Sequence, residues 1–399
     1  MENIQNFSKR INQKNLIYLL IFLFTLHFTP ATYVESSFLE NLVGSSNVGL
    51  IYALASVLTI IVLAIVRKIV KKTGNYKTFL NALIVEFISL SILSLCLFVE
   101  VNTFWVVVFI VTFISGFVAR SVAFFNFDIF AEHLSNDAEA GGVRDVLLTS
   151  ANFAYVAGPV LSGLLVSSDQ EIGKIFVLGV ILLIPIIQIT RKYFKNYQDA
   201  QYKDYEFLGT LFYIMRKADL RRIFICNFIL YLFYSWMIIY TPIYLHDAIG
   251  FNLGEIGIII GIALIPFLLL EMFLGKLADT KYGEKEMLTV GLIIAGLSTI
   301  SMAIFSAKIF FLWAAILFVT RIGASMIESM SETYVFKKVK DGSLDVISMY
   351  RAVRPVTYIF GTIFASILLS YFDIKILFIV LGIIMIMGIN FSLKIKDTL

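Results

Sequence analysis

The chain has 399 residues, of which 59% are hydrophobic and only 15% are charged. Soluble globular domains carry about 25% charged residues, so this composition excludes a soluble domain of any size and indicates that much of the surface faces lipid. The net charge of +4 is small, and the two cysteines, Cys96 and Cys226, lie in apolar runs that indicate neither a disulfide framework nor a metal site.

Twelve apolar runs along the chain are long enough to cross a membrane, which takes roughly 20 residues of helix. The predicted spans are 16–36, 47–66, 78–99, 103–126, 146–167, 172–190, 223–245, 255–274, 287–306, 309–330, 348–371 and 374–393. The runs are too long and too uniformly apolar for barrel strands, so the predicted fold class is an all-α integral membrane protein. Because so many spans follow the first run, we interpret it as a retained helix and not as a signal peptide.

The basic residues are distributed unequally between the loops of the two sides. Segments that share a side with both termini hold 25 of the 32 Lys and Arg residues, whereas the opposite loops hold 3. Basic residues collect on the cytoplasmic side of membrane proteins. The sequence therefore predicts a multi-pass protein of the cell (plasma) membrane with both termini in the cytoplasm.

One long polar stretch, 191–222, divides the spans six and six. We interpret it as a cytoplasmic linker, in part helical, at the basic inner surface of the membrane. It leaves residues 1–190 and 223–399 as two six-helix bundles. Arg120 in the fourth span and Arg321 in the tenth hold corresponding places in the two halves. Weak internal symmetry of this kind is typical of repeat-built transporters.

The loop after the eighth span carries Gly275, Asp279 and Gly283 among basic residues. It resembles the Gly-x-Leu-Ala-Asp-Arg-x-Gly-Arg-Lys loop of the major facilitator superfamily, with one extra residue before Gly283. The corresponding loop after the second span, 67–74, is degenerate and keeps only Gly74. The resemblance implies the fold of that superfamily, two pseudo-symmetric six-helix bundles. It also implies that Asp279 helps to latch the halves in an outward-facing state.

The fifth span contains Gly158 and Pro159, followed by Gly163. This run resembles the Gly-Pro-x-x-Gly-Gly motif of exporter-type members of the superfamily, although Ser162 stands in place of one glycine. The resemblance implies an exporter, similar to drug/proton antiporters.

Charged side chains within the spans are candidates for function, because each costs roughly 2.5–3.5 kcal/mol on insertion scales. In the tenth span, the spacing of Arg321, Ser325, Glu328 and Glu332 puts them on one helix face, which we expect to face a central cavity. One interpretation is that Arg321 binds a substrate anion and Glu328 carries a proton. The alternatives are an internal ion pair, or an interfacial Glu328 that reaches water.

The first four spans contain three further candidates. Glu86, in an apolar part of the third span, is either a proton carrier or the structural partner of Arg120 in the fourth. Arg120 itself fits a clamp or gate residue better than a ligand contact. His27, central in the first span, is either part of proton coupling or a hydrogen-bonded packing residue. Glu35, near the end of that span, is expected to reach the lipid headgroups.

The function predicted from these features is secondary active transport by alternating access, with proton-coupled efflux of a small organic solute. The alternatives are uptake of a nutrient, such as a sugar or an organic anion, by symport, and a non-transporting receptor or scaffold. The chain has no phosphate-binding loop, paired metal-ligand spacing or nucleophile elbow. We therefore expect no enzyme activity, cofactor, metal or nucleic-acid partner, and a monomer whose partners are its substrate, protons or another coupling ion, and the bilayer.

Overall fold

The computed structural model describes residues 2–134, 140–195, 197, 207–277, 283–338 and 344–396, and these residues are almost entirely helical. Each of the twelve predicted spans coincides with a helix. In these ranges, eleven helices are long and apolar enough to cross a membrane, and Ser150–Leu165 forms a shorter apolar helix in the fifth span. The predicted all-α membrane fold is therefore confirmed.

The first half of the chain forms seven α-helices and two short 3₁₀ turns. They are α1 (Glu2–Thr32), α2 (Glu35–Val43), α3 (Ser45–Thr73), α4 (Asn75–Leu93), η1 (Ser94–Leu97), α5 (Thr103–Leu134), α6 (Ala140–Leu165), η2 (Asp169–Glu171) and α7 (Gly173–Tyr193). The second half contains α8 (Phe207–Arg216), α9 (Ala218–Ile243), the π-helical turn η3 (Tyr244–Ala248), α10 (Leu253–Leu277), α11 (Gly283–Ile304), α12 (Phe310–Lys338), α13 (Leu344–Leu369) and α14 (Lys375–Ser392).

The predicted end of the first span, at residue 36, is wrong. The helix α1 ends at Thr32, and a turn separates it from the short helix α2. Pro30 lies inside the last turn of α1, where it removes a backbone N–H from the helical hydrogen-bond pattern. Because of this break, Glu35 begins a new helix and is fully enclosed by protein, with 3% of its surface exposed.

The helices cluster into two compact units. Unit 1 comprises Met1–Leu42 and Leu54–Tyr202, and unit 2 comprises Val43–Ala53 and Lys203–Leu399. The first turns of α3 thus belong to unit 2, and the rest of α3 to unit 1. The linker boundaries at 190 and 223 stay predictions.

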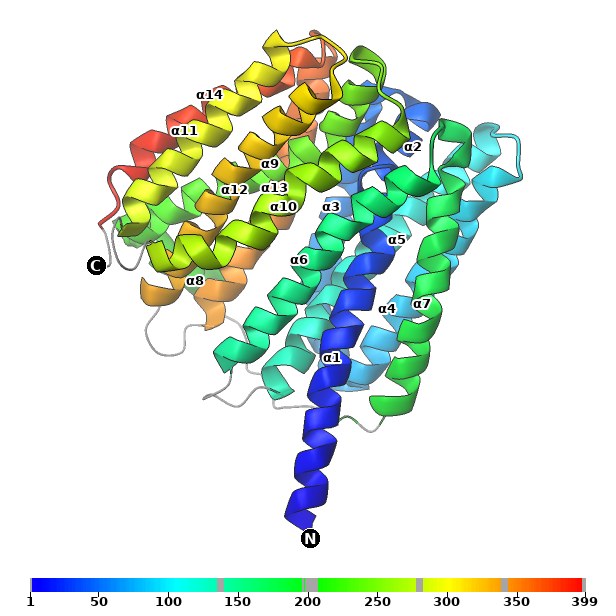
Figure 1. The fold of residues 1–399 in the computed structure, drawn as a ribbon. Coiled ribbons are helices and arrows are strands. Elements are labelled where there is room, and N and C mark those ends of the chain that lie inside the picture. The colour runs from blue at the N-terminus through cyan, green and yellow to red at the C-terminus, as the bar shows by residue number, and fades with distance from the viewer. Residues whose placement is uncertain are drawn as a thin grey trace. The chain divides into compact units, whose positions relative to one another are not determined.

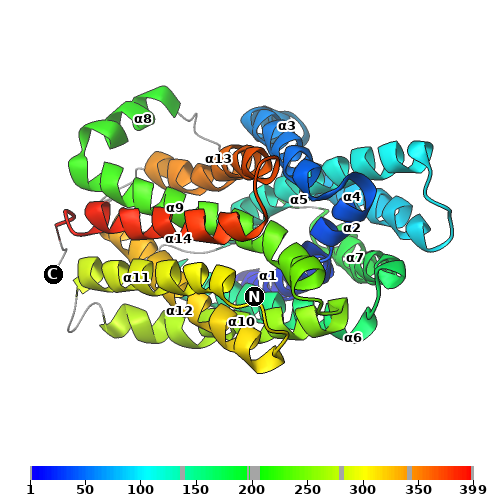
Figure 2. The same cartoon turned by 90° about the horizontal axis from the view of Figure 1, so that it is seen from above.

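The helix pairings in the two units repeat one another (Figures 1 and 2). In unit 1, α1 packs on α5, α6 and α7, and α4 packs on α5 and α7. In unit 2, α9 packs on α12, α13 and α14, and α11 packs on α12 and α14. The first, third, fourth, fifth and sixth spans of each half therefore make the same contacts, as expected for two pseudo-symmetric bundles.

Glycines in a left-handed conformation begin corresponding helices in the two halves. Gly74 precedes α4 with a φ of 86°, and Gly283 begins α11 with a φ of 75°. Gly44 and Gly250 likewise stand before α3 and α10, with φ of 79° and 86°. Residues with a Cβ are strained in this region. The degenerate loop 67–74 therefore retains the one residue that its turn requires.

Close packing of α11 against α12 depends on two facing glycines. A Cβ added to Gly323 would lie 2.6 Å from the carbonyl oxygen of Gly291 and 2.5 Å from the backbone nitrogen of Ala295. Small residues allow helix backbones in membranes to approach in this way. Since the nearest atoms belong to the backbone, they cannot move aside without separating the helices.

We expect Gly323→Leu to destabilise unit 2 by about 1–3 kcal/mol or more, the usual cost of overpacking. The measurement is the melting temperature and the monodisperse yield of the detergent-purified protein. Val319→Leu is the matched control, because Val319 lies on the same helix with 40% of its surface exposed. Equal stability of the two variants would contradict the close-packing argument.

Candidate functional site

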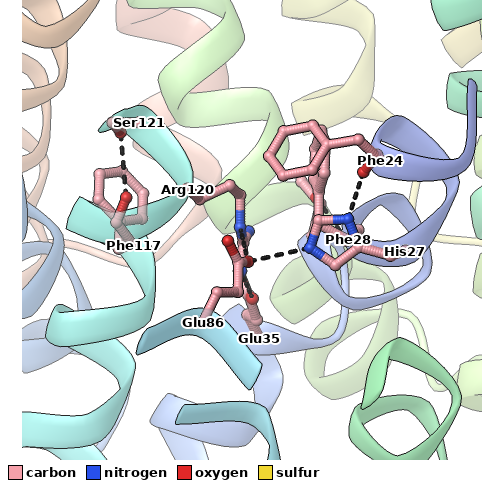
Figure 3. Close-up of polar contacts among 9 residues, drawn as sticks. Phe24, His27, Phe28, Glu35, Glu86, Phe117, Arg120 and Ser121 are labelled. Atoms are coloured by element: carbon pink, nitrogen blue, oxygen red, sulfur yellow. Dashed lines mark hydrogen bonds and ion pairs between the residues drawn. The ribbon is translucent and has the colours of Figure 1, made fainter. Parts of the chain in front are cut away.

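Four ionisable side chains from four helices of unit 1 meet in one buried cluster (Figure 3). His27 comes from α1, Glu35 from the start of α2, Glu86 from the middle of α4 and Arg120 from α5. Arg120 donates through Nε to Glu86 Oε1 at 2.9 Å and through Nη2 to Glu35 Oε1, also at 2.9 Å. His27 Nε2 lies 3.1 Å from the same Glu86 oxygen. We call these four residues the buried tetrad.

The surroundings of the buried tetrad are apolar and aromatic. The side chains of Glu86 and His27 are fully buried, and that of Arg120 is 12% exposed. The Arg120 guanidinium lies 5.2 Å from the centre of the Phe28 ring, a distance at which a cation is attracted to an aromatic face. Phe24 packs against the His27 ring at 4.7 Å. Burial of this kind makes any uncompensated charge in the tetrad costly.

Both ring nitrogens of His27 face hydrogen-bond acceptors. Nδ1 contacts the carbonyl oxygen of Phe24, and Nε2 faces the Glu86 carboxylate. A neutral imidazole has one donor and one acceptor nitrogen, so it satisfies only one of these contacts. His27 Nε2 lies 3.1 Å from the Glu86 carboxylate but makes no hydrogen bond among the described residues.

The charges of the buried tetrad do not balance when His27 is neutral. With His27 neutral, two carboxylates and one guanidinium leave the cluster with one net negative charge. One added proton makes it neutral. In addition, Glu86 Oε2 is buried with no hydrogen-bond partner among the described residues.

A second group of polar residues lies in unit 2, on α9 and α12. Tyr234 of α9 donates its hydroxyl to Glu328 Oε2 at 2.7 Å. Arg321, one of the predicted site residues, is 3% exposed, and its guanidinium lies 5.1 Å from the centre of the Phe233 ring. Ser325 is also buried, whereas Glu328 and Glu332 are partly exposed. The predicted stripe is therefore buried at Arg321 and Ser325 and partly exposed at Glu328 and Glu332, and a central cavity beside it stays a prediction.

The two arginines occupy corresponding places in their units. Arg120 lies over Phe28 of the first span of unit 1, and Arg321 lies over Phe233 of the first span of unit 2. The two arginines differ in whether an acidic residue on the third span of the same half lies beside them. In α4, Glu86 pairs with Arg120, whereas the acidic residues of α11, Glu284 and Glu286, lie in its first turn. The repeat has thus diverged at its charged positions.

The structure places the predicted glycines and proline at helix crossings and helix starts. A Cβ at Gly158 of α6 would collide with Thr29 of α1, whose hydroxyl donates to the carbonyl oxygen of Ala154 at 3.0 Å. Pro159 and Gly163 lie within α6, Gly275 lies within α10, and Gly283 begins α11. Asp279 and its proposed latch lie outside the described residues.

Sequence reasoning missed two residues of these groups. Glu35 was expected to reach the headgroups, and that expectation is wrong, because Glu35 is buried and pairs with Arg120. The break after Pro30 is the signal that Glu35 is not simply the outer end of a span. Nothing in the spacing of Tyr234 of α9 indicates its contact with Glu328 of α12.

Comparisons with known proteins agree with this architecture. Residues 223–397 match the model of the Major Facilitator Superfamily. No curated protein sequence matches the chain. A crystal structure of a bacterial homologue of the iron transporter ferroportin, in an inward-facing state, has a TM-score of 0.75 at 13% identity and covers 96% of this chain and 98% of its own. A bacterial metal transporter has a TM-score of 0.68 at 12% identity, with the same coverage.

Both similar structures are described as those of metal transporters or their homologues. Identities of this size establish the fold alone. The chain is therefore a multi-pass membrane protein with the major facilitator fold, and residues 223–397 are similar to the Major Facilitator Superfamily.

Proposed function

We propose that the protein is a proton-coupled secondary transporter of a small organic solute that works by alternating access. The observation that supports this most is the buried tetrad, in which His27, Glu86, Arg120 and Glu35 together need one proton to be neutral. A receptor or scaffold with the same fold has no need for such a cluster. Ionisable residues inside membrane segments are rare and commonly mark proton relays.

In this proposal, the proton resides between His27 and Glu86, and Arg120 holds both carboxylates in place. A proton-loaded cluster is neutral and can remain buried at little cost. The deprotonated cluster carries a negative charge, which favours a conformation that admits water or a compensating charge. This difference links the protonation state of the buried tetrad to the conformation of the transporter.

An organic solute is supported as the substrate by the polar residues of unit 2. Arg321 brings a guanidinium that suits an anionic group, and the Tyr234–Glu328 pair offers acceptor oxygens beside aromatic rings. Metal transport is the second candidate, because both similar structures are described as metal transporters or their homologues. Against it, the described residues contain no group of three His, Cys, Asp or Glu that could hold a metal ion.

Export is the direction that the motif at Gly158 and Pro159 supports, and uptake by symport is the alternative. We also propose that the protein lies in the plasma membrane as a monomer with both termini in the cytoplasm, as the distribution of basic residues predicts.

The test uses the purified full chain in liposomes that contain a pH-sensitive dye. Addition of a transported solute should move protons and change the internal pH, without ATP. Panels of organic anions, organic cations, sugars and divalent metal ions separate the substrate classes. If only divalent metal ions cause proton movement, the assignment of an organic solute as substrate is wrong. If the substrate flux is independent of pH, the assignment of proton coupling is wrong.

The substrate assignment leads to a prediction for Tyr234. Its hydroxyl donates to the partly exposed Glu328, and hydrogen bonds to charged groups contribute about 1.5–3 kcal/mol. We expect Tyr234→Phe to free the Glu328 carboxylate, to lower the melting temperature and to raise the KM for the transported solute about tenfold or more. Tyr371→Phe is the control, since Tyr371 is 79% exposed. An unchanged KM would remove the Tyr234–Glu328 pair from the substrate site.

A further inference from the structure

The short helix α8 has two unlike faces. Thr210 and Ile214, one turn apart, are buried where α8 packs on α9 and α13 of the same unit. The other side exposes large apolar side chains: Phe212 is 63% exposed and Met215 is 50% exposed. Figure 2 shows α8 on the outside of α13 and directly before α9. An apolar face of this kind is unfavourable in water.

Basic side chains follow this apolar face immediately. Arg216, Lys217 and Arg221 are exposed, and none has an acidic partner among the described residues. Their geometry is fixed locally: Arg221 donates to the carbonyl oxygen of Met215 at 3.0 Å, and the Lys217 ammonium lies 5.9 Å from the Tyr213 ring. These two cations are thus held close to the exposed apolar side chains, and Arg216 lies beside them in the chain.

The position of α8 along the chain relates both features to the membrane. The next helix, α9, is part of the candidate membrane span Ala218–Ala248. The end of α8 therefore lies at the edge of a span, where hydrocarbon gives way to lipid headgroups. An amphipathic helix at this depth buries its apolar face among acyl chains and keeps its cations at the headgroups.

We propose that α8 lies in the membrane interface and binds anionic phospholipids, with Phe212 and Met215 among the acyl chains and Arg216, Lys217 and Arg221 at the phosphate groups. A basic residue near an anionic bilayer surface strengthens binding about fivefold. Because α8 packs on α13, bound anionic lipid also stabilises this end of unit 2. The inference is independent of the proposed transport function.

The test uses the full-length protein in nanodiscs of phosphatidylcholine mixed with phosphatidylglycerol. Lipids that remain bound after extraction are counted by native mass spectrometry. We expect phosphatidylglycerol to be enriched on the natural protein, and at least tenfold less so on the triple variant Arg216→Gln, Lys217→Gln, Arg221→Gln. The control is Lys174→Gln with Lys308→Gln, which removes two basic residues that are each 48% exposed elsewhere. Equal enrichment on the triple variant and the natural protein would overturn the proposal.

A second measurement tests the apolar face separately. An environment-sensitive fluorophore is attached at Phe212→Cys, with Cys96→Ser and Cys226→Ser to remove the other thiols. We expect quenching by brominated acyl chains. A probe in water overturns the membrane placement. So does a probe shielded only at high protein concentration, which would indicate a second copy of the chain. Displacement of phosphatidylglycerol by inorganic phosphate at similar concentration would identify a free-anion site and also overturn the lipid assignment.

Discussion

Arg120→Gln is expected to destabilise unit 1 severely, because it leaves Glu35 and Glu86 buried without the cation that they share. Both carboxylates lie 2.9 Å from the guanidinium. Removing one partner of a buried ion pair costs about 3–5 kcal/mol, a large part of the stability of most domains. The melting temperature and the yield of monodisperse protein in detergent should both fall sharply.

The double variant Arg120→Gln with Glu35→Gln separates a charge effect from a packing effect. It leaves Glu86 beside His27, which together are neutral when they hold one proton. We therefore expect it to recover part of the lost stability. The control Lys174→Gln breaks the solvent-exposed pair with Glu171 and should not change the melting temperature. If Arg120→Gln melts like the natural protein, or if Glu35→Gln makes it worse, the charge-balance account of the buried tetrad is wrong.

Much of the fold could be predicted from the sequence, because membrane spans are determined by long apolar runs and the limited ways of satisfying the backbone in lipid. The twelve spans and the repeat of two bundles follow from the apolar runs and from this constraint on the backbone. The ends were less certain. At Pro30, hydropathy continues past a point where the backbone breaks, so residue 36 was predicted to end the first span although its helix ends at Thr32.

The site could be predicted only in part, because contacts between helices depend on how the helices rotate and cross. The sequence shows that Glu86 and Arg120 are charges in apolar surroundings. It allows Glu86 to be either a proton carrier or the partner of Arg120. In the structure, the two side chains form an ion pair. It does not show that Glu35 reaches Arg120, because 85 residues separate them. His27 joins them through its rotation on α1, which hydropathy does not reveal.

Glu86→Gln is expected to abolish proton-driven accumulation while it preserves the fold. The amide keeps the shape of the carboxyl group, and its oxygen can still accept from Arg120 Nε. Without the Glu86 charge, Arg120 and Glu35 form a neutral pair, so the cluster no longer needs a proton. Its melting temperature should therefore stay close to that of the natural protein, in contrast to Arg120→Gln.

The effect on transport follows from the energy of one proton. A gradient of one pH unit supplies about 1.4 kcal/mol per proton, which supports roughly tenfold accumulation for a one-to-one exchange. Liposomes with the natural protein should approach this ratio, and those with Glu86→Gln should stay near equal concentrations. Exchange of labelled for unlabelled solute, which needs no gradient, should continue in the variant and lose its dependence on pH.

Two comparisons make the expected result specific to the shared proton. His27→Gln keeps the Glu86 carboxyl, so we expect it to shift the pH at which transport is half-maximal and not to remove the coupling. Glu328→Gln removes the other candidate carboxyl, which lies in unit 2. If the Glu86→Gln variant accumulates the solute fully and the Glu328→Gln variant does not, the proton carrier is Glu328. Full accumulation by both variants would exclude both carboxyl groups as the proton carrier, because a neutral amide cannot exchange a proton with water across this range of pH.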